Sequence, residues 1–178
     1  MFARFTLHFA VACVFFGCSD PPDPVAELVR ARDFGALVLL GEDPDEKLAC
    51  RATRAVVWAR GPEVVAPHLA LLKHTRCGWD IRAEAAWALA EEATGGERNI
   101  ALTAMTPLLA DPDEKIRWNG ARTIGLLGLP EGVPVVEKCL VDANKFVAAW
   151  CAWAKCKLGP GKGCAKPNMD LTNGKPAP

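Results

Sequence analysis

The chain has 178 residues, of which 51% are hydrophobic and 24% are charged, and its 21 basic side chains balance its 21 acidic ones. This composition is typical of one globular domain and, with a single long apolar stretch, excludes a polytopic membrane protein. Balanced charge without a local basic stripe also argues against nucleic acid as a partner.

The N-terminus has the layout of a secretory signal. Arg4 precedes an apolar run over residues 5–17, which is shorter than the ~20 residues needed to span a bilayer. Gly17, Cys18 and the polar stretch after them resemble the lipobox of bacterial lipoproteins, although Phe15 stands where that family prefers Leu. The resemblance implies that residues 1–17 are removed and that the Cys18 sulfur carries a lipid, which anchors the chain to a membrane.

The same resemblance implies a location in the cell envelope. Ser19 stands where an Asp retains enterobacterial lipoproteins in the inner membrane, so we expect an outer-membrane lipoprotein that faces the periplasm. The alternative is an ordinary cleaved signal, in which case Cys18 is half of a disulfide.

Residues 18–32 are expected to form the anchor linker and the start of the first helix. Pro24 follows Asp23, and proline at the first helical position after a capping residue is typical of a helix start. Residues 24–40 therefore predict one or two helices before the first full repeat.

An internal repeat organises the middle of the chain. The pentapeptide Asp43–Lys47 recurs letter for letter as Asp111–Lys115, 68 residues later, and half of that spacing is about one helix pair. Four similar helical patterns begin 33, 35 and 31 residues apart, at Leu48, Ile81, Ile116 and Val147. Small side chains four and five places later let neighbouring helices approach closely. Second apolar segments follow the first three patterns at roughly 63–73, 99–110 and 131–140.

Two helices in each unit of this length predict an all-α fold. We expect an α-solenoid of about four helix pairs, a right-handed α–α superhelix, over residues 33–159. A generic Ala-rich helical bundle is the alternative. Residues 160–178, with several Gly, Pro and Asn residues, predict an irregular C-terminal tail.

The segments Asp111–Arg117 and Ala121–Gly128 resemble the short HEAT-like repeats of phycobilisome lyases. The resemblance covers about residues 43–159. It implies that an Arg one place after the first apolar residue pairs with the Asp that opens a neighbouring repeat. Arg82 and Arg117 hold this place in the middle copies, whereas the end copies have alanine. We therefore expect an ion-pair ladder only in the middle of the stack.

Six cysteines follow Cys18, and an even number in an exported protein indicates disulfides. Six cysteines allow 15 pairings, which sequence alone does not resolve. The flexible stretch between Cys156 and Cys164 favours a bridge that pins the tail to the last helix. Stacking places the starts of neighbouring leading helices side by side, which favours Cys50 with Cys77 and leaves Cys139 with Cys151.

The alternative to a disulfide at Cys77 is a metal site formed by His68, His74 and Cys77. It lacks a fourth ligand and the compact spacing of zinc sites, so we expect no metal and no cofactor.

Motifs for catalysis are absent from the sequence. There is no Gly-rich phosphate loop, no His-Glu-x-x-His and no Gly-x-Ser-x-Gly, and capping explains the acidic residues at helix starts. The sequence therefore predicts that the chain is not an enzyme. We expect a lipid-anchored, non-catalytic scaffold that binds another envelope protein. The alternatives are an accessory or lyase-like subunit related to the bilin lyases and a purely structural envelope lipoprotein.

Arginine and tryptophan recur along one side of the predicted leading helices. Six places after the first apolar residue stand Arg54, Trp87, Arg122 and Trp153, and three places after it stand Arg51, Glu84, Asn119 and Trp150. Trp and Arg often dominate interface energies, and neighbouring Arg–Trp pairs form cation–π contacts of about 0.5–1 kcal/mol when exposed. We predict a partner-binding ridge of Trp87, Arg122, Trp153, Arg54 and Trp150. The alternative is that the N-terminal segment or the tail covers the tryptophan rings.

Overall fold

The computed structural model describes residues 22–160, 163–167, 169–170 and 175–176. The predicted signal over residues 1–17 and the predicted lipid site at Cys18 lie outside these residues. Within them, no helix is both long enough and apolar enough to cross a membrane.

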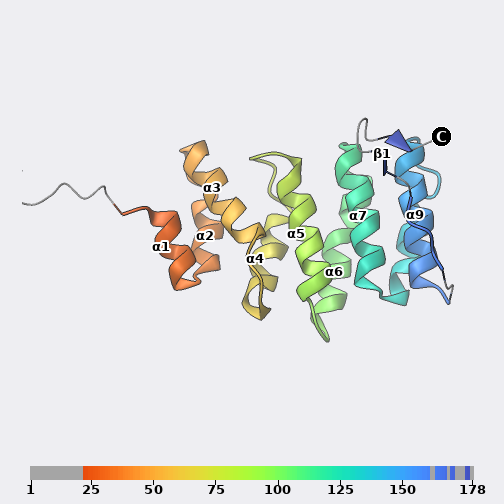
Figure 1. Ribbon diagram of the computed structural model, residues 1–178, viewed down its shortest axis with the longest axis horizontal. Helices are drawn as coiled ribbons and strands as arrows, with labels where there is room; N and C mark the ends of the chain where they lie inside the picture. Colours follow the sequence, from red (N-terminus) through yellow and green to blue (C-terminus); the bar gives the residue numbers. More distant parts are fainter. Residues whose placement is uncertain (1–21, 161–162, 168, 171–174, 177–178) are drawn as a thin grey trace, which may run out of the picture.

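The described chain is a stack of helical hairpins that runs from one end of the molecule to the other (Figure 1). The leading helices are α3 (Glu46–Val57), α5 (Trp79–Glu92), α7 (Glu114–Leu127) and α9 (Lys145–Leu158). The second segments are η1 (Pro62–Val64) with α4 (Val65–Leu71), α6 (Glu97–Met105) with η2 (Thr106–Ala110), and η3 (Pro130–Gly132) with α8 (Val133–Glu137). This arrangement confirms the predicted all-α solenoid.

The N-terminal end of the stack has the two helices predicted for residues 24–40, whereas the last unit has a single helix within the described residues. Helices α1 (Pro24–Ala31) and α2 (Phe34–Leu40) form an additional hairpin before α3, and α9 has no second helix within the described residues. Asp23 caps α1 by accepting a hydrogen bond from the Val25 amide at 3.1 Å, with Pro24 at the first helical position, as predicted.

The recurring pentapeptide starts a leading helix through both of its aspartates. Asp113 accepts a hydrogen bond from the Lys115 amide at 2.8 Å and so caps α7. Asp111, two places earlier, accepts from the Asp113 amide at 2.9 Å and fixes the turn into the helix. The first copy repeats both bonds with the equivalent side chains, Asp45 and Asp43. The sequence recurrence is therefore a recurrence of capping geometry.

Small side chains permit the close approach of the helices, as their spacing predicts. At the predicted fourth place, a Cβ on Gly120 would lie 2.9 Å from the Leu108 Cβ. Outside the predicted places, a Cβ on Gly125 would lie 2.7 Å from an indole carbon of Trp153. The apolar residues eight places after each start line the core, where Val56, Leu89 and Ile124 are all 0% exposed. At Gly120 and Gly125, packing this tight makes any larger side chain destabilising.

The C-terminal tail contains more order than the prediction. Two short strands, β1 (Met169–Asp170) and β2 (Lys175–Pro176), pair antiparallel, and β2 lies against α9 (Figure 1). The disulfide between Cys156 and Cys164 joins the tail to α9, which keeps this pair near the end of the stack.

Candidate binding surface

The outer side of the leading helices carries the predicted arginines and one of the predicted tryptophans. Arg54 on α3 is exposed, whereas Trp87 on α5 and Arg122 on α7 are half-buried. The Arg54 guanidinium donates to the Asp80 carboxylate at 2.8 Å and to the Cys77 carbonyl at 3.3 Å, so its donors are partly used within the stack.

Arg122 is the arginine of this surface whose guanidinium N–H groups are not used in hydrogen bonds among the described residues. Its guanidinium carbon lies 5.3 Å from the centroid of the Trp87 ring, which is a cation–π contact between neighbouring leading helices. Among the described residues, Arg122 has no hydrogen-bond acceptor and no ion-pair partner. The planar guanidinium is therefore held in place by the ring while its N–H groups stay available.

Glu84 is the acidic neighbour of this pair. Burial raises the pKa of the Glu84 carboxyl, and the positive charge of Arg122 opposes that rise. One of its oxygens, Oε2, is buried without a hydrogen-bond donor. The two side chains are thus coupled electrostatically without forming a direct salt bridge.

The prediction that the ridge continues onto α9 as an exposed surface is wrong. Trp150 and Trp153 on α9 are only 3% and 4% exposed. Trp150 stacks on Trp118 with 5.9 Å between ring centroids and meets Trp153 edge to face at 5.2 Å. Trp153 fits because Gly125 on α7 leaves room for its ring. These two tryptophans therefore belong to the core between α7 and α9.

Two exposed apolar side chains extend the surface beyond the predicted residues. Trp58 is 65% exposed and Leu126 is 37% exposed. Both stand ten places after the first apolar residue of their units, and places three, six and ten share one side of a helix. The same spacing in the sequence could have predicted both residues. Trp58 places an aromatic side chain beside Arg54, and Leu126 places an aliphatic side chain beside Arg122. We call Arg54, Trp58, Trp87, Arg122 and Leu126 the leading-helix surface.

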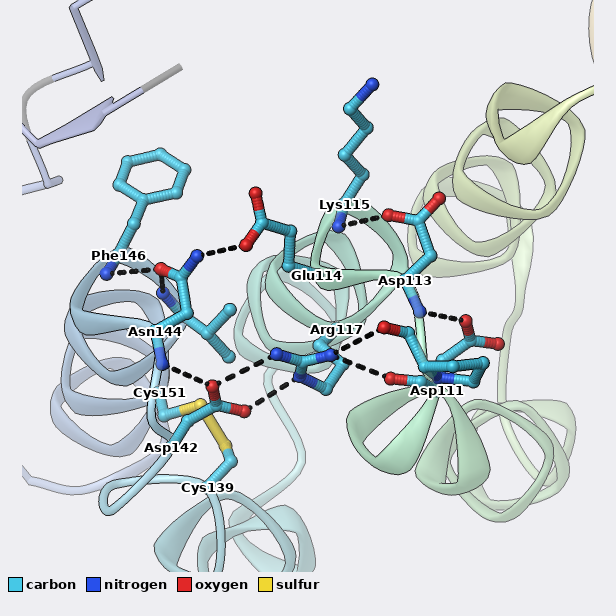
Figure 2. Close-up of polar contacts among 12 residues, drawn as sticks. Asp111, Asp113, Glu114, Lys115, Arg117, Cys139, Asp142, Asn144, Phe146 and Cys151 are labelled. Atoms are coloured by element: carbon cyan, nitrogen blue, oxygen red, sulfur yellow. Dashed lines mark hydrogen bonds and ion pairs between the residues drawn. A yellow bond between two sulfur atoms is a disulfide. The ribbon is translucent and has the colours of Figure 1, made fainter. Parts of the chain in front are cut away.

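The predicted ion pairs of Arg82 and Arg117 are present, at the second and third junctions between leading helices. Figure 2 shows Arg117 of α7 between two loops. Its guanidinium donates to both carboxylate oxygens of Asp142, at 2.8 and 3.2 Å, and to the carbonyls of Asp111 and Pro112 at 2.9 and 3.1 Å. The hydrogen bond from Arg117 holds the pKa of Asp142 below its usual value. One junction earlier, Arg82 pairs with Asp111.

The first junction of the repeats is built differently. Ala49 stands in place of the ladder arginine, and Arg76 stands where the next repeat would offer its aspartate. The disulfide between Cys50 and Cys77, with an S–S distance of 2.09 Å, crosses this junction instead. Arg76 donates to backbone carbonyls of the preceding loop, the nearest being that of Asp43 at 3.0 Å.

All three favoured cysteine pairings are confirmed. Besides the bridges at Cys50–Cys77 and Cys156–Cys164, Cys139 is bonded to Cys151. The alternative metal site does not form, because Cys77 is consumed by its disulfide and buried His68 bonds the Val56 carbonyl at 3.0 Å. Within the described part of the chain, no group of three or more His, Cys, Asp or Glu side chains could hold a metal ion.

Comparison with solved structures finds the same architecture in another protein. Human deoxyhypusine hydroxylase, in complex with glycerol, matches with a TM-score of 0.55 and 19% sequence identity. The match covers 87% of this chain and 54% of that chain, so the present chain spans about half the length of the hydroxylase. The likeness shows a shared fold of the HEAT-repeat type. Neither a family model nor a curated protein matches the sequence.

This neighbour corrects the prediction that the chain is not an enzyme. The prediction rested on a helical-repeat fold without familiar catalytic motifs, yet the hydroxylase is an enzyme with a fold of the same type. The inference from fold to lack of catalysis is therefore wrong, since fold alone does not determine function.

Proposed function

We propose that this chain is an exported helical-repeat scaffold that binds another protein of the cell envelope through its leading-helix surface. A solenoid presents an extended surface without needing a deep active site. Three disulfides within the described residues suit an oxidising compartment outside the cytosol. A lipid on Cys18 holds the scaffold at the outer membrane, facing the periplasm.

The observation that carries the proposal is the state of Arg122. Its guanidinium is oriented by the Trp87 ring and lacks an acceptor among the described residues. A guanidinium in this state binds a carboxylate in two-point geometry at a small cost in side-chain entropy. Leu126, four places after Arg122 on α7, provides apolar contact area beside the charge, and exposed Trp58 at the end of α3 provides a second apolar contact farther along the same surface. We therefore expect a partner with an acidic side chain next to an apolar patch.

Partner capture tests this surface. The tagged chain is cross-linked in cells, solubilised and recovered, and the captured protein is quantified for each variant. Arg122→Ala is expected to lower recovery of one stoichiometric partner at least tenfold, because Arg is among the few residue types whose truncation at the centre of an interface costs about 2 kcal/mol or more. Arg30→Ala is the matched control, since Arg30 is an exposed arginine of α1 outside this surface. Equal recovery with both variants refutes the proposed surface.

Membrane attachment is tested separately. Cys18→Ser removes the acceptor sulfur, so the chain is expected to leave the membrane fraction or to keep its signal uncleaved. Membrane retention and cleavage equal to those of the unmodified chain refute the anchor but leave the partner surface untouched.

A further inference from the structure

A groove of about 410 Å³ is lined by residues of the second segments and of the turn after α8, none of which belongs to the leading-helix surface. Its walls are η2, the end of α8 and the turn after α8, and they present mainly apolar side chains: Pro107, Leu109, Ala110, Val135 and Val141. The volume falls in the range of small-molecule sites in proteins.

The groove exists because the second segment of the third repeat is short. The second segment of the third repeat, η3 with α8, has eight residues, whereas the segment before it, α6 with η2, has fourteen. The chain turns away after Glu137, so nothing among the described residues covers the outer side of η2. Val141 in this turn is 87% exposed at the edge of the groove, the most exposed large apolar side chain in the described chain.

Most polar groups of the groove are already bonded within the fold. The Asp142 carboxylate accepts both hydrogen bonds from Arg117, and the Thr106 hydroxyl donates to the Leu102 carbonyl at 2.8 Å. Lys138 is different, because its ammonium is exposed and has no partner among the described residues. An apolar trough with one unpaired cation at its rim complements a ligand with an apolar chain and an anionic head.

We propose that this groove binds the acyl chain of a fatty acid, with the carboxylate paired to Lys138. The chain lies against Leu109, Val135 and Val141, and Lys138 provides the charge that separates a fatty acid from a neutral lipid. This site is independent of the proposed anchor and of the leading-helix surface.

Decanoate and decanol are the probes for this proposal. The protein, purified as it occurs in the cell, is labelled at its Leu and Val methyl groups, and each probe is titrated while NMR shifts are followed. Decanoate is expected to shift the methyl groups of Leu109, Val135 and Val141 and not that of Leu39, which lies on α2 at the other end of the stack. Decanol is expected to shift the same methyls with affinity about two- to fivefold weaker, the value of one exposed ion pair.

Two variants separate the charge from the apolar contact. Lys138→Met keeps the apolar stem and should bring decanoate down to the affinity of decanol, whereas the control Lys145→Met should change neither. Ala110→Trp fills the groove from an exposed position and should abolish both titrations. Equal binding of the two probes in the unmodified chain, or shifts that persist in Ala110→Trp, overturns the proposal. Methyl shifts that depend on protein concentration without any probe would assign the groove to a second copy of the chain and also overturn it.

Discussion

The ion pair at the last junction should contribute more to stability than a surface ion pair. Arg117 and Asp142 have side chains that are only 18% and 11% exposed. Replacing Arg117 by Met leaves the largely buried Asp142 carboxylate without its cation. The replacement also removes two hydrogen bonds from Arg117 to loop carbonyls. Breaking a buried pair on one side costs about 3–5 kcal/mol, and partial exposure places this case at the lower end, about 3 kcal/mol.

Arg51 provides the matched control. It pairs with Asp23 across the junction of α3 with α1, but these side chains are 48% and 41% exposed. Arg51→Met should therefore cost between about 0 and 1 kcal/mol. For a chain of this size, the difference corresponds to a fall in Tm of roughly 4–12 °C for Arg117→Met beyond that of Arg51→Met.

Thermal and urea unfolding, followed by circular dichroism, measure both variants. Asp142→Asn keeps the acceptor for the Asn144 amide and completes a double-mutant cycle with Arg117→Met. The double variant should lose at least 1 kcal/mol less than the sum of the single variants, because the two groups act on one another. Additive losses, or equal losses for Arg117→Met and Arg51→Met, would refute the assignment of stability to the ladder.

Three further changes test the packing, the titration and the cross-link. Gly125→Ala should destabilise the fold by about 1–2 kcal/mol because its Cβ meets an indole carbon at 2.7 Å, whereas Gly35→Ala, whose nearest neighbour is 3.7 Å away, should be neutral or stabilising in thermal unfolding. Burial lowers the pKa of His68 in the folded chain, so the neutral imidazole contributes fully to folding stability above about pH 6.5. This stabilisation is lost as the pH falls below that value, because the unfolded chain then binds the proton more readily. His68→Gln should therefore flatten the dependence of unfolding free energy on pH between about 7 and 5. Replacing both Cys50 and Cys77 by Ala should cost about 3–4 kcal/mol in urea unfolding, given their separation of 27 residues.

The fold was predictable because its determinants are local and periodic. Each copy of the pentapeptide carries its own capping side chains, so the starts of α3 and α7 follow from a few adjacent residues. The Cys50–Cys77 pair followed from stacking, because the starts of neighbouring leading helices lie side by side, whereas Cys156–Cys164 followed from the flexible stretch between them and Cys139–Cys151 by elimination. Cys50 and Cys77 met the geometry that this stacking requires, with Cα atoms 5.2 Å apart.

The features that were not predictable depend on contacts between distant segments. Whether Trp153 is exposed depends on a glycine on the neighbouring helix and on the tail that returns to α9, and a helical repeat pattern contains neither. The groove depends on where α8 ends, which is decided by a turn after Glu137 rather than by a clear breaker residue. Periodicity describes the average unit, whereas these sites are departures from it.

The first repeat junction shows how such a departure stays compatible with the stack. The ladder needs a basic residue on one unit and an acidic residue on the next, and a half-buried charge without its partner is costly. At this junction, Ala49 replaces the basic residue and Arg76 replaces the acidic residue, and the Cys50–Cys77 disulfide joins the two units. Because each unit of a solenoid contacts only its neighbours, this exchange affects one junction and leaves the ion pairs of the others intact. Reduction of the bridge should therefore loosen the N-terminal units first, while α5, α7 and α9 stay held together by Arg82–Asp111 and Arg117–Asp142.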